Sequence, residues 1–237
     1  MIDAYLSKSP NPYKIHIFLE ETQLPHKLIW VDVTVGDHKT PEFLKVSPNA
    51  KIPAIVDHDP VGGGAPVEIF ESAAILIYLA EKTGNLLPPD IHGRMEVMKW
   101  LIWQVAGLGP MCGQLGHFSL YAPKDNPYAL TRYRNEALRL YGVLEKQLAG
   151  RTHIAGDYSI ADIACYPWIR MSPFSGIDLA QFPNLQRWLD TVSARPAVTA
   201  AYARVETQAP AKKGTPEQFQ KFLFNNHCST EATPAFR

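Results

Sequence analysis

Two short apolar runs and the helix that follows them constrain the fold of this chain most. The first run, Pro53 to Val56, opens with a proline, and the second, Val67 to Phe70, follows a glycine-rich loop. Because proline cannot donate a hydrogen bond to a sheet ladder, Pro53 belongs at the start of a strand, beside exposed backbone that is able to pair with a peptide. The two runs therefore predict a hairpin with a peptide-binding end.

A helix is expected to begin directly after this hairpin, at Glu71 and Ser72. The first turn of a helix has N–H groups without intrahelical partners and carries the positive end of the helix dipole, and both features stabilise a carboxylate. Together with the strand start at Pro53, this helix start predicts a site for a small acidic peptide.

The charge balance argues against several classes of partner. Lys plus Arg and Asp plus Glu number 23 each among 237 residues, so no overall field attracts nucleic acid or an anionic membrane. No apolar run approaches the length of a membrane span, and the first residues have no basic region followed by an apolar stretch. We expect a cytoplasmic globular protein whose partners are neither nucleic acid nor membrane.

The order of the expected elements predicts two domains. The first is an α/β domain, residues 1–84, in which strands at 2–6, 28–33, 53–56 and 67–70 alternate with helices at 11–21, 41–46 and 72–84. A linker at 85–92 leads to an all-helical domain, 93–204. We expect its helices at 95–105, 128–148, 160 onward, 182–195 and 197–204, with residues 205–237 as a C-terminal extension.

Two details of the second domain and the extension carry further expectations. Ser159 and Asp162 have the spacing of a capping box, in which the serine and the acid satisfy each other's backbone N–H groups. The extension carries three phenylalanines, Phe219, Phe222 and Phe224, and one hypothesis is that they restrict access to a cleft.

The cysteines indicate neither a metal site nor a dithiol mechanism borne by the protein. Cys112, Cys165 and Cys228 are far apart in the sequence and form no CxxC pair. Cys165 stands within an apolar run, where a cysteine usually acts as a small core residue. We therefore expect no metal ion.

Taken together, the Ile52-Pro53 strand start, the Glu71-Ser72 pair and the capping box resemble the glutathione S-transferases over residues 1–204. The resemblance implies a thioredoxin-like α/β domain followed by an all-α domain. Three runs are similar to the bacterial nu class of this superfamily, which is related to fungal nitrogen regulators: residues 9–11, 47–57 and 103–111. That class consists of glutathione-dependent disulfide-bond reductases with peroxidase activity.

The resemblance implies glutathione as a co-substrate and assigns roles in binding it. Pro53 is expected to follow a cis peptide bond, and the backbone of Ile52 to pair with the cysteinyl unit. Glu71 is expected to meet the γ-glutamyl ammonium, and Ser72 with its helix start the γ-glutamyl carboxylate. His38, where the family tends to carry glutamine, and Lys51 are candidates for the glycyl carboxylate.

Asn11 and Ser9 are the candidates for activating the glutathione thiol, because donors at a helix N-terminus lower a thiol pKa. The class usually has threonine where this chain has Ser9 and glycine where it has Pro12, so one backbone donor is lost. Tyr5 is the main rival, since other glutathione transferases use a tyrosine near the first strand, although its alternation with Ala4 and Leu6 also suits packing.

Arg132 corresponds to an arginine that contacts glutathione in the class, and otherwise is a solvated charge on a helix face. Four aromatic residues are candidates either for the wall of a co-substrate pocket or for core and dimer packing: Trp100, Trp103, Phe118 and Tyr121. The superfamily also implies a homodimer.

The leading functional prediction is glutathione-dependent reduction of disulfides, with peroxidase activity toward organic hydroperoxides and weak transferase activity. Glutathione or its disulfide and a small organic disulfide or hydroperoxide are the expected ligands. Two alternatives stay open, namely a conventional transferase that conjugates electrophiles and a regulatory protein that binds glutathione without catalysis. A thioredoxin-type enzyme would need a nucleophilic cysteine at the first helix, and residues 7–14 contain none.

Overall fold

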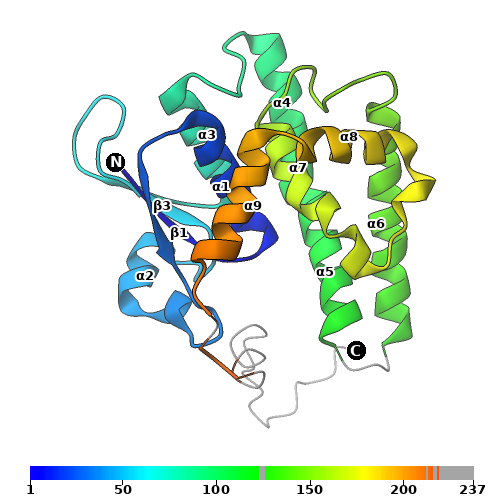
Figure 1. Ribbon diagram of the computed structural model, residues 1–237, viewed down its shortest axis with the longest axis horizontal. Coiled ribbons are helices and arrows are strands. Elements are labelled where there is room, and N and C mark those ends of the chain that lie inside the picture. Colours follow the sequence, from blue (N-terminus) through cyan, green and yellow to red (C-terminus); the bar gives the residue numbers. More distant parts are fainter. Residues whose placement is uncertain (123–125, 212, 216–217, 219–237) are drawn as a thin grey trace, which may run out of the picture.

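The computed structural model describes residues 1–122, 126–211, 213–215 and 218. Two halves lie side by side, a small sheet with its helices and a larger helical part (Figure 1). The first half contains β1 (Ile2–Leu6), α1 (Pro10–Thr22), β2 (His26–Trp30), α2 (Pro41–Val46), β3 (Ala54–Asp57), β4 (Val67–Phe70) and α3 (Ser72–Thr83). The second contains α4 (Ile91–Trp103), α5 (Gly109–Leu120), α6 (Pro127–Gln147), α7 (Ile160–Arg170), α8 (Pro183–Ser193) and α9 (Pro196–Gln208).

The sheet has the strand order β2-β1-β3-β4 and mixes parallel with antiparallel pairs. β1 runs parallel to β2 and antiparallel to β3, and β4 returns antiparallel to β3 as the predicted hairpin. In β1, Ile2, Ala4 and Leu6 alternate with less buried residues, so one face of the strand packs into the core. This α/β half and the helical half confirm the predicted fold class.

Some predicted boundaries of the first half are wrong by one to three residues. α1 begins at Pro10 with Ser9 as its N-cap, and not at Asn11, because Pro10 and Pro12 both fit a first turn whose N–H groups have no intrahelical partner. β2 begins two residues before the predicted start, and β3 begins at Ala54 after the proline. The helices at 41–46 and 72–83 lie where they were predicted.

In the second half, the sequence prediction missed α5. The predicted helix ends at residue 105, whereas a π-helical turn at Gln104–Leu108 carries the chain from α4 directly into α5. Pro110 falls in the first turn of α5, so it removes no hydrogen bond from the helix interior. The capping box of α7 is present, with both reciprocal bonds between Ser159 and Asp162 formed.

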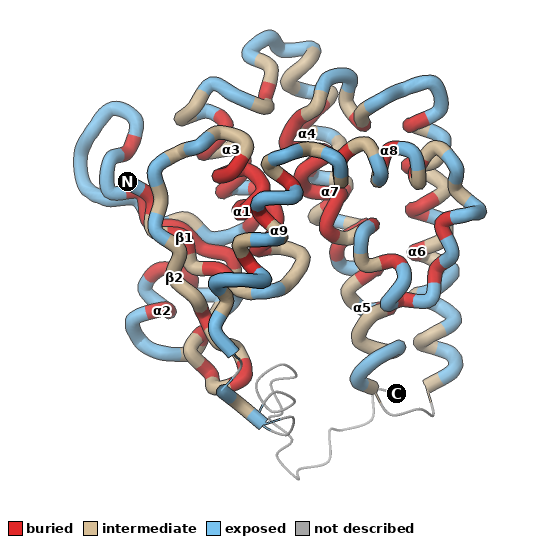
Figure 2. The backbone as a smooth tube through the Cα atoms, viewed as in Figure 1, coloured by how far each residue is buried: buried red, intermediate tan, exposed pale blue. Residues whose placement is uncertain are grey.

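The core joins the two halves instead of dividing between them. Buried residues follow β1, α1, α3 and α7 through the middle of the molecule (Figure 2). Ion pairs hold α1 to α9. Arg195, the N-cap of α9, donates to both carboxylate oxygens of Glu21 at 2.7 and 2.9 Å, and Arg204 lies 2.8 Å from Glu20. Within the described residues, no helix is long and apolar enough to cross a membrane.

Candidate functional site

The chain segments that carry the predicted site meet at one end of the sheet. Tyr5 of β1 and Phe70 of β4 both pair with Ala54 of β3. Since β1 and β4 run antiparallel to β3, the residues after β1, the residues before β3 and the residues after β4 leave the sheet at the same end. The α1 N-terminus, Pro53 and the Glu71-Ser72 pair are therefore neighbours.

The loop before β3 has the expected backbone. The Ile52–Pro53 peptide bond is cis, and Ser47 Oγ donates to the carbonyl of Lys51 at 2.8 Å. Ile52 lies beyond the last paired residue of β3, Ala54, at the end of the strand ladder. This bracing holds the Ile52 backbone at the site end of the sheet.

Glu71 and Ser72 differ sharply in their surroundings. Glu71 is exposed and has φ 71° and ψ 114°, a conformation that residues with a side chain rarely adopt and that clusters at functional sites. Ser72, the first residue of α3, is buried, and its Oγ accepts a hydrogen bond from Lys14 Nζ at 3.1 Å. The pair thus combines an exposed acid with a buried hydroxyl at a helix start.

Lys14 links this pair to the helical half. Its side chain is 1% exposed, and Nζ also donates to Gln104 Oε1 at 2.6 Å in the π-helical turn. Burial lowers the pKa of Lys14 to about 7, against the opposing effects of Cys165 and Glu71.

Asn11 lies in the first turn of α1 and is tied to α7. Trp168 Nε1 donates to Asn11 Oδ1 at 3.2 Å. Beside it, the hydroxyl oxygens of Ser7 and Ser9 lie 3.3 Å apart, so one of them donates to the other. The start of α1 therefore presents an amide and two hydroxyls.

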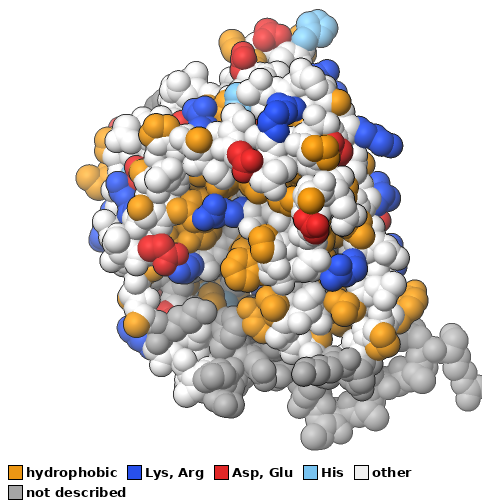
Figure 3. All heavy atoms as spheres, turned by 45° about the vertical axis from the view of Figure 1, so that its right-hand side comes forward, with side chains coloured by type: hydrophobic (Ala, Val, Ile, Leu, Met, Phe, Trp, Pro, Cys, Tyr) orange, Lys and Arg blue, Asp and Glu red, His pale blue; other side chains and the backbone are white. Residues whose placement is uncertain are grey.

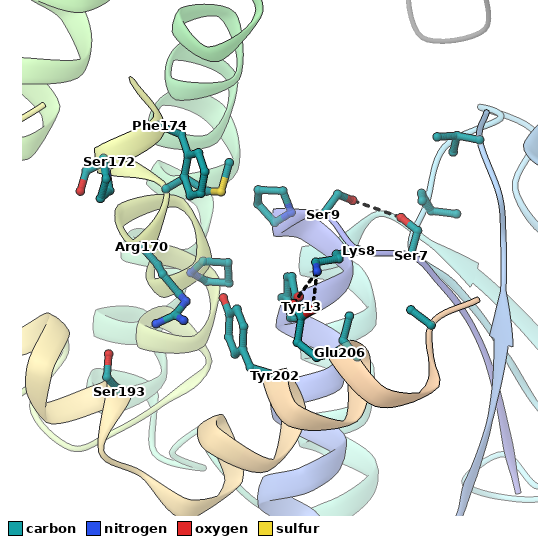
Figure 4. Close-up of a pocket in the computed structure, with 18 of the residues that line it drawn as sticks. Ser7, Lys8, Ser9, Tyr13, Arg170, Ser172, Phe174, Ser193, Tyr202 and Glu206 are labelled. Atoms are coloured by element: carbon teal, nitrogen blue, oxygen red, sulfur yellow. Dashed lines mark hydrogen bonds and ion pairs between the residues drawn. The ribbon is translucent and has the colours of Figure 1, made fainter. Parts of the chain in front are cut away.

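A cavity of about 1650 Å³ opens beside this helix start, between the α/β half and the ends of α7 and α9. Its walls include Tyr13, which stacks on Tyr202 with the ring centroids 4.0 Å apart, and Arg170, whose guanidinium lies 4.4 Å from the centre of the Tyr202 ring (Figure 4). Lys8 and Glu206 form an ion pair across it. The volume exceeds what one small ligand usually fills.

The surface on this side of the molecule is mixed in character. In the space-filling view, apolar side chains gather in the middle of the face, and Lys, Arg, Asp and Glu side chains surround them (Figure 3). Such an arrangement suits a ligand that has both apolar and charged parts.

The structure divides the predicted site residues into two groups. Ser9, His38, Lys51 and Ile52 line the cavity. His38 is buried, and burial with Lys39 and Lys51 lowers the pKa of its imidazole, which favours the neutral form. The remaining predicted residues are not among the described lining residues: Asn11, Pro53, Glu71, Ser72 and Arg132.

Arg132 is the outlier among these five. It is exposed on α6 and lies 3.8 Å from Glu136, whereas the others belong to the segments that meet at the sheet end. Its part in glutathione binding stays a prediction.

Tyr5 and the aromatic candidates have different surroundings. Tyr5 packs edge-on against Phe43 with centroids 5.8 Å apart, which agrees with a packing role. Trp100 and Trp103 contact each other, and Phe118 stacks on Tyr133. Of the four candidates, Tyr121 lines the cavity.

Sequence reasoning missed five residues of the site region: Tyr13, Lys14, Gln104, Trp168 and Tyr202. All five lie on helices. Tyr13, Trp168 and Tyr202 look like packing residues in the sequence, and Lys14 and Gln104 look like solvated ones. Trp168 is 157 positions from its partner Asn11, so no local pattern connects them.

The described cysteines are unsuited to thiol chemistry. Cys112 and Cys165 are both buried, and burial raises the pKa of Cys112 to about 12 and that of Cys165 further. Cys228 and the phenylalanines of the C-terminal extension lie outside the described residues. No group of three or more His, Cys, Asp or Glu side chains in the described part of the chain is arranged to hold a metal ion.

Comparisons with known proteins identify the family of the chain. Profiles described as the N-terminal and C-terminal domains of glutathione S-transferase match residues 8–82 and 109–196. The chain is 49% identical over 207 residues to the disulfide-bond oxidoreductase YfcG of Escherichia coli (strain K12), covering 87% of this chain and 96% of the relative. It is also 33% identical to the transcriptional regulator URE2 of Saccharomyces cerevisiae, covering 81% and 65%.

Solved structures show the same fold. A glutathione transferase family member from Pseudomonas fluorescens, with two glutathione bound, superposes with a TM-score of 0.80 at 45% identity and covers 84% of this chain and 91% of its own. A glutathione transferase from Pseudomonas putida, with one glutathione disulfide per subunit, gives 0.81 at 42% identity, with 84% and 90% covered. The chain belongs to the glutathione S-transferase family.

Proposed function

We propose that this protein is a glutathione-dependent disulfide-bond reductase. The observation that carries the proposal is the hydrogen bond from Trp168 to Asn11. An indole N–H only donates, so Asn11 must turn its carbonyl oxygen to Trp168, and its NH₂ group stays available as a donor at the start of α1. A donor in that place stabilises a thiolate, as does the helix dipole.

The remaining residues each bind a different part of glutathione. Glu71 binds the γ-glutamyl ammonium, Ser72 and the first turn of α3 bind the γ-glutamyl carboxylate, and the Ile52 backbone pairs with the cysteinyl unit. His38 and Lys51 then lie on the cavity wall for the glycyl carboxylate. The neutral imidazole of His38 donates one hydrogen bond, and Lys51 supplies the positive charge.

The chemistry needs two glutathiones and no cysteine of the enzyme. One glutathione thiolate attacks a sulfur of the substrate disulfide, forms a mixed disulfide and expels a thiolate, which takes a proton from water. A second glutathione thiolate attacks the glutathione sulfur of the mixed disulfide, expels the other substrate thiolate and leaves glutathione disulfide. The cavity volume and the two ligand states of the Pseudomonas relatives support this scheme.

The same thiolate supports reduction of organic hydroperoxides and weak conjugation to electrophiles. In the peroxide reaction the sulfur takes the terminal oxygen and becomes a sulfenic acid, while the alkoxide leaves and takes a proton. A second glutathione thiol then converts the sulfenic acid to glutathione disulfide and water. A homodimer is also proposed. Exposed apolar residues on the edge strand β4 and on α4 support it, because such residues often mark an interface: Val67, Phe70, Ile91, Met95 and Ile102. We propose that the protein works in the cytoplasm, where glutathione is reduced.

The test compares the protein with its Asn11→Ala variant. Glutathione-dependent reduction of hydroxyethyl disulfide is measured together with reduction of cumene hydroperoxide and conjugation to chlorodinitrobenzene. We expect disulfide turnover to fall about 100-fold in the variant, as for loss of one donor to a developing anion. Asn135→Ala, at an exposed position of α6, is the matched control and should retain full activity.

The outcomes separate the alternatives. Conjugation that exceeds disulfide reduction would favour a conventional transferase. Binding of glutathione without any of the three activities would favour a regulatory protein.

A further inference from the structure

Lys14 is a positive charge placed where positive charges are rarely found. It belongs to the first half of α1 and is 1% exposed, between the start of α3 and the π-helical turn. Burying an ammonium is costly unless it is paired, and both of its hydrogen-bond acceptors, Ser72 Oγ and Gln104 Oε1, are neutral. Among the described residues, no ion pair joins Lys14 to a carboxylate, and Glu71, the acid that raises its pKa, is exposed. A buried ammonium here therefore favours a further negative charge from a ligand.

The bond to Ser72 has a direction that matters for a ligand. In its ammonium form Lys14 has three donors and no acceptor, so Ser72 Oγ then accepts from Lys14 Nζ. The single hydroxyl hydrogen of Ser72 is then free to point away from Lys14, toward a ligand carboxylate at the first turn of α3. Lys14 thereby converts Ser72 into an oriented donor.

The helical half is built to accommodate this arrangement. A Cβ at position 109 would lie 2.6 Å from Gln104 Nε2, so a side chain there would displace the Gln104 amide from its present position. With Nε2 lying against Gly109, Gln104 directs Oε1 to Lys14 at 2.6 Å. Gly109 and the π-helical turn thus hold the second acceptor in place.

We propose that Lys14 is a positioning residue for the γ-glutamyl carboxylate. Its ammonium lies on the far side of the Ser72 hydroxyl from the carboxylate and orients that hydroxyl. Lys14 takes up a proton as the ligand binds. The inference rests on the proposed function, because it takes Ser72 as the residue that receives this carboxylate.

The charges around Lys14 support proton uptake. Burial lowers its pKa to about 7, and a carboxylate arriving beside Ser72 raises it again. The titratable groups that act on it are Cys165 of α7 and Glu71 at the start of α3, and the Cys165 thiol is neutral because burial raises its pKa.

The charged groups of the other elements packed on α1 pair elsewhere. On α9, Arg204 pairs with Glu20 and Glu206 with Lys8. On β1, Asp3 lies 2.9 Å from His58. The arriving carboxylate is therefore the main new charge that Lys14 meets.

The test measures the binding of S-methylglutathione, which has no titrating thiol, by calorimetry between pH 6 and pH 8. If only the ammonium form binds well, a free pKa of about 7 makes the dissociation constant rise about tenfold over this range. Buffers of different ionisation enthalpy should report uptake of roughly 0.8 proton per ligand at pH 7.5. Burial lowers the pKa of the His38 imidazole, so its own titration contributes least at the alkaline end of this range.

Two variants and a control separate the roles. In Lys14→Met, binding at pH 6 should weaken about tenfold and lose its pH dependence, because the charge and the fixed hydroxyl are both gone. In Gln104→Met, Lys14 loses one acceptor, so the midpoint of the pH dependence should move to lower pH. Lys146→Met, at an exposed position near the end of α6, should bind like the wild type.

Each result decides a different question. Failure of the wild type to bind S-methylglutathione would overturn the proposed function itself. Binding by the wild type without proton uptake, or a Lys14→Met variant that keeps the wild-type pH dependence, would overturn the role of Lys14 alone. If Lys14→Met does not fold, the wild-type proton uptake and the Gln104→Met midpoint still decide.

Discussion

The indole Nε1 of Trp168 donates a hydrogen bond to Oδ1 of Asn11 across 3.2 Å, and this bond joins the middle of the helical half to the first turn of α1. Gly109 and Gly113 of α5 leave room for the indole, since a Cβ at either position would lie 3.3 or 3.4 Å from it. The orientation of one amide in the α/β half is therefore decided by packing in the other half.

Trp168→Phe should lower disulfide reductase activity about tenfold with little change in the KM for glutathione. Phenylalanine keeps an aromatic ring but removes the indole N–H donor, so the Asn11 amide is free to turn its oxygen toward the thiolate. Steady-state kinetics of hydroxyethyl disulfide reduction measure the effect. Trp100→Phe is the control, because the Trp100 indole donates to Glu96 instead of to Asn11. An equal loss of activity in Trp100→Phe would contradict the role of the Trp168 N–H.

Glu71→Gly should separate stability from binding. Glycine adopts the φ of 71° without steric cost, so the free energy of unfolding should stay the same or rise by about 1 kcal/mol. Glutathione binding should weaken by about tenfold or more, because the partner of the ammonium is lost. Urea unfolding and calorimetry measure the two quantities.

Gln23→Gly is the control for this variant, since Gln23 has φ 51° at the end of α1, far along the helix from Asn11. It should leave glutathione binding unchanged. A Glu71→Gly protein that binds glutathione normally would remove Glu71 from the site.

Asp162→Ala should destabilise the protein by about 3–5 kcal/mol. The buried carboxylate accepts hydrogen bonds from Ile154 N at 3.0 Å, Ser159 N at 3.1 Å and Trp188 Nε1 at 2.8 Å, and alanine leaves all three donors unpaired. Asp162→Asn keeps one acceptor oxygen and should lose less. Chemical unfolding measures both, and equal losses would contradict this account.

Acid should destabilise the protein through His16. Burial, with His26 and Arg204, lowers the pKa of His16 to about 3 from its ordinary 6.5. Between these two pKa values the unfolded chain binds a proton at His16 and the folded protein does not. The contribution of neutral His16 to the free energy of unfolding is therefore complete above pH 6.5 and is lost as the pH falls toward 3.

His16→Phe tests this prediction. The imidazole stacks on Trp30 with the centroids 5.6 Å apart, a contact that a phenyl ring can keep. The fall in the free energy of unfolding between pH 6.5 and pH 4 should become shallower in the variant. Parallel curves for variant and wild type would assign the acid sensitivity to other groups.

Local patterns explain why the first half was largely predictable. The proline before β3, the glycines of the hairpin and the apolar face of α3 each act within a few residues. The capping box of α7 is equally local, because Ser159 and Asp162 are three positions apart and satisfy each other's backbone. The sequence prediction missed the helix boundaries near prolines and the π-helical turn. At these places helical and non-helical backbone conformations have similar local preference, and packing against neighbouring elements decides between them.

The sequence by itself therefore determined the fold class, the hairpin that ends at Glu71 and Ser72, and the candidate residues at the start of α1. The tertiary structure alone decided how those side chains are oriented and charged. Asn11 is oriented by an indole 157 positions away, and Lys14 is 1% exposed between two acceptors, one of which lies 90 positions away. Hydrogen-bond direction and desolvation depend on which groups are adjacent in space, and that adjacency exists only after the two halves have packed together.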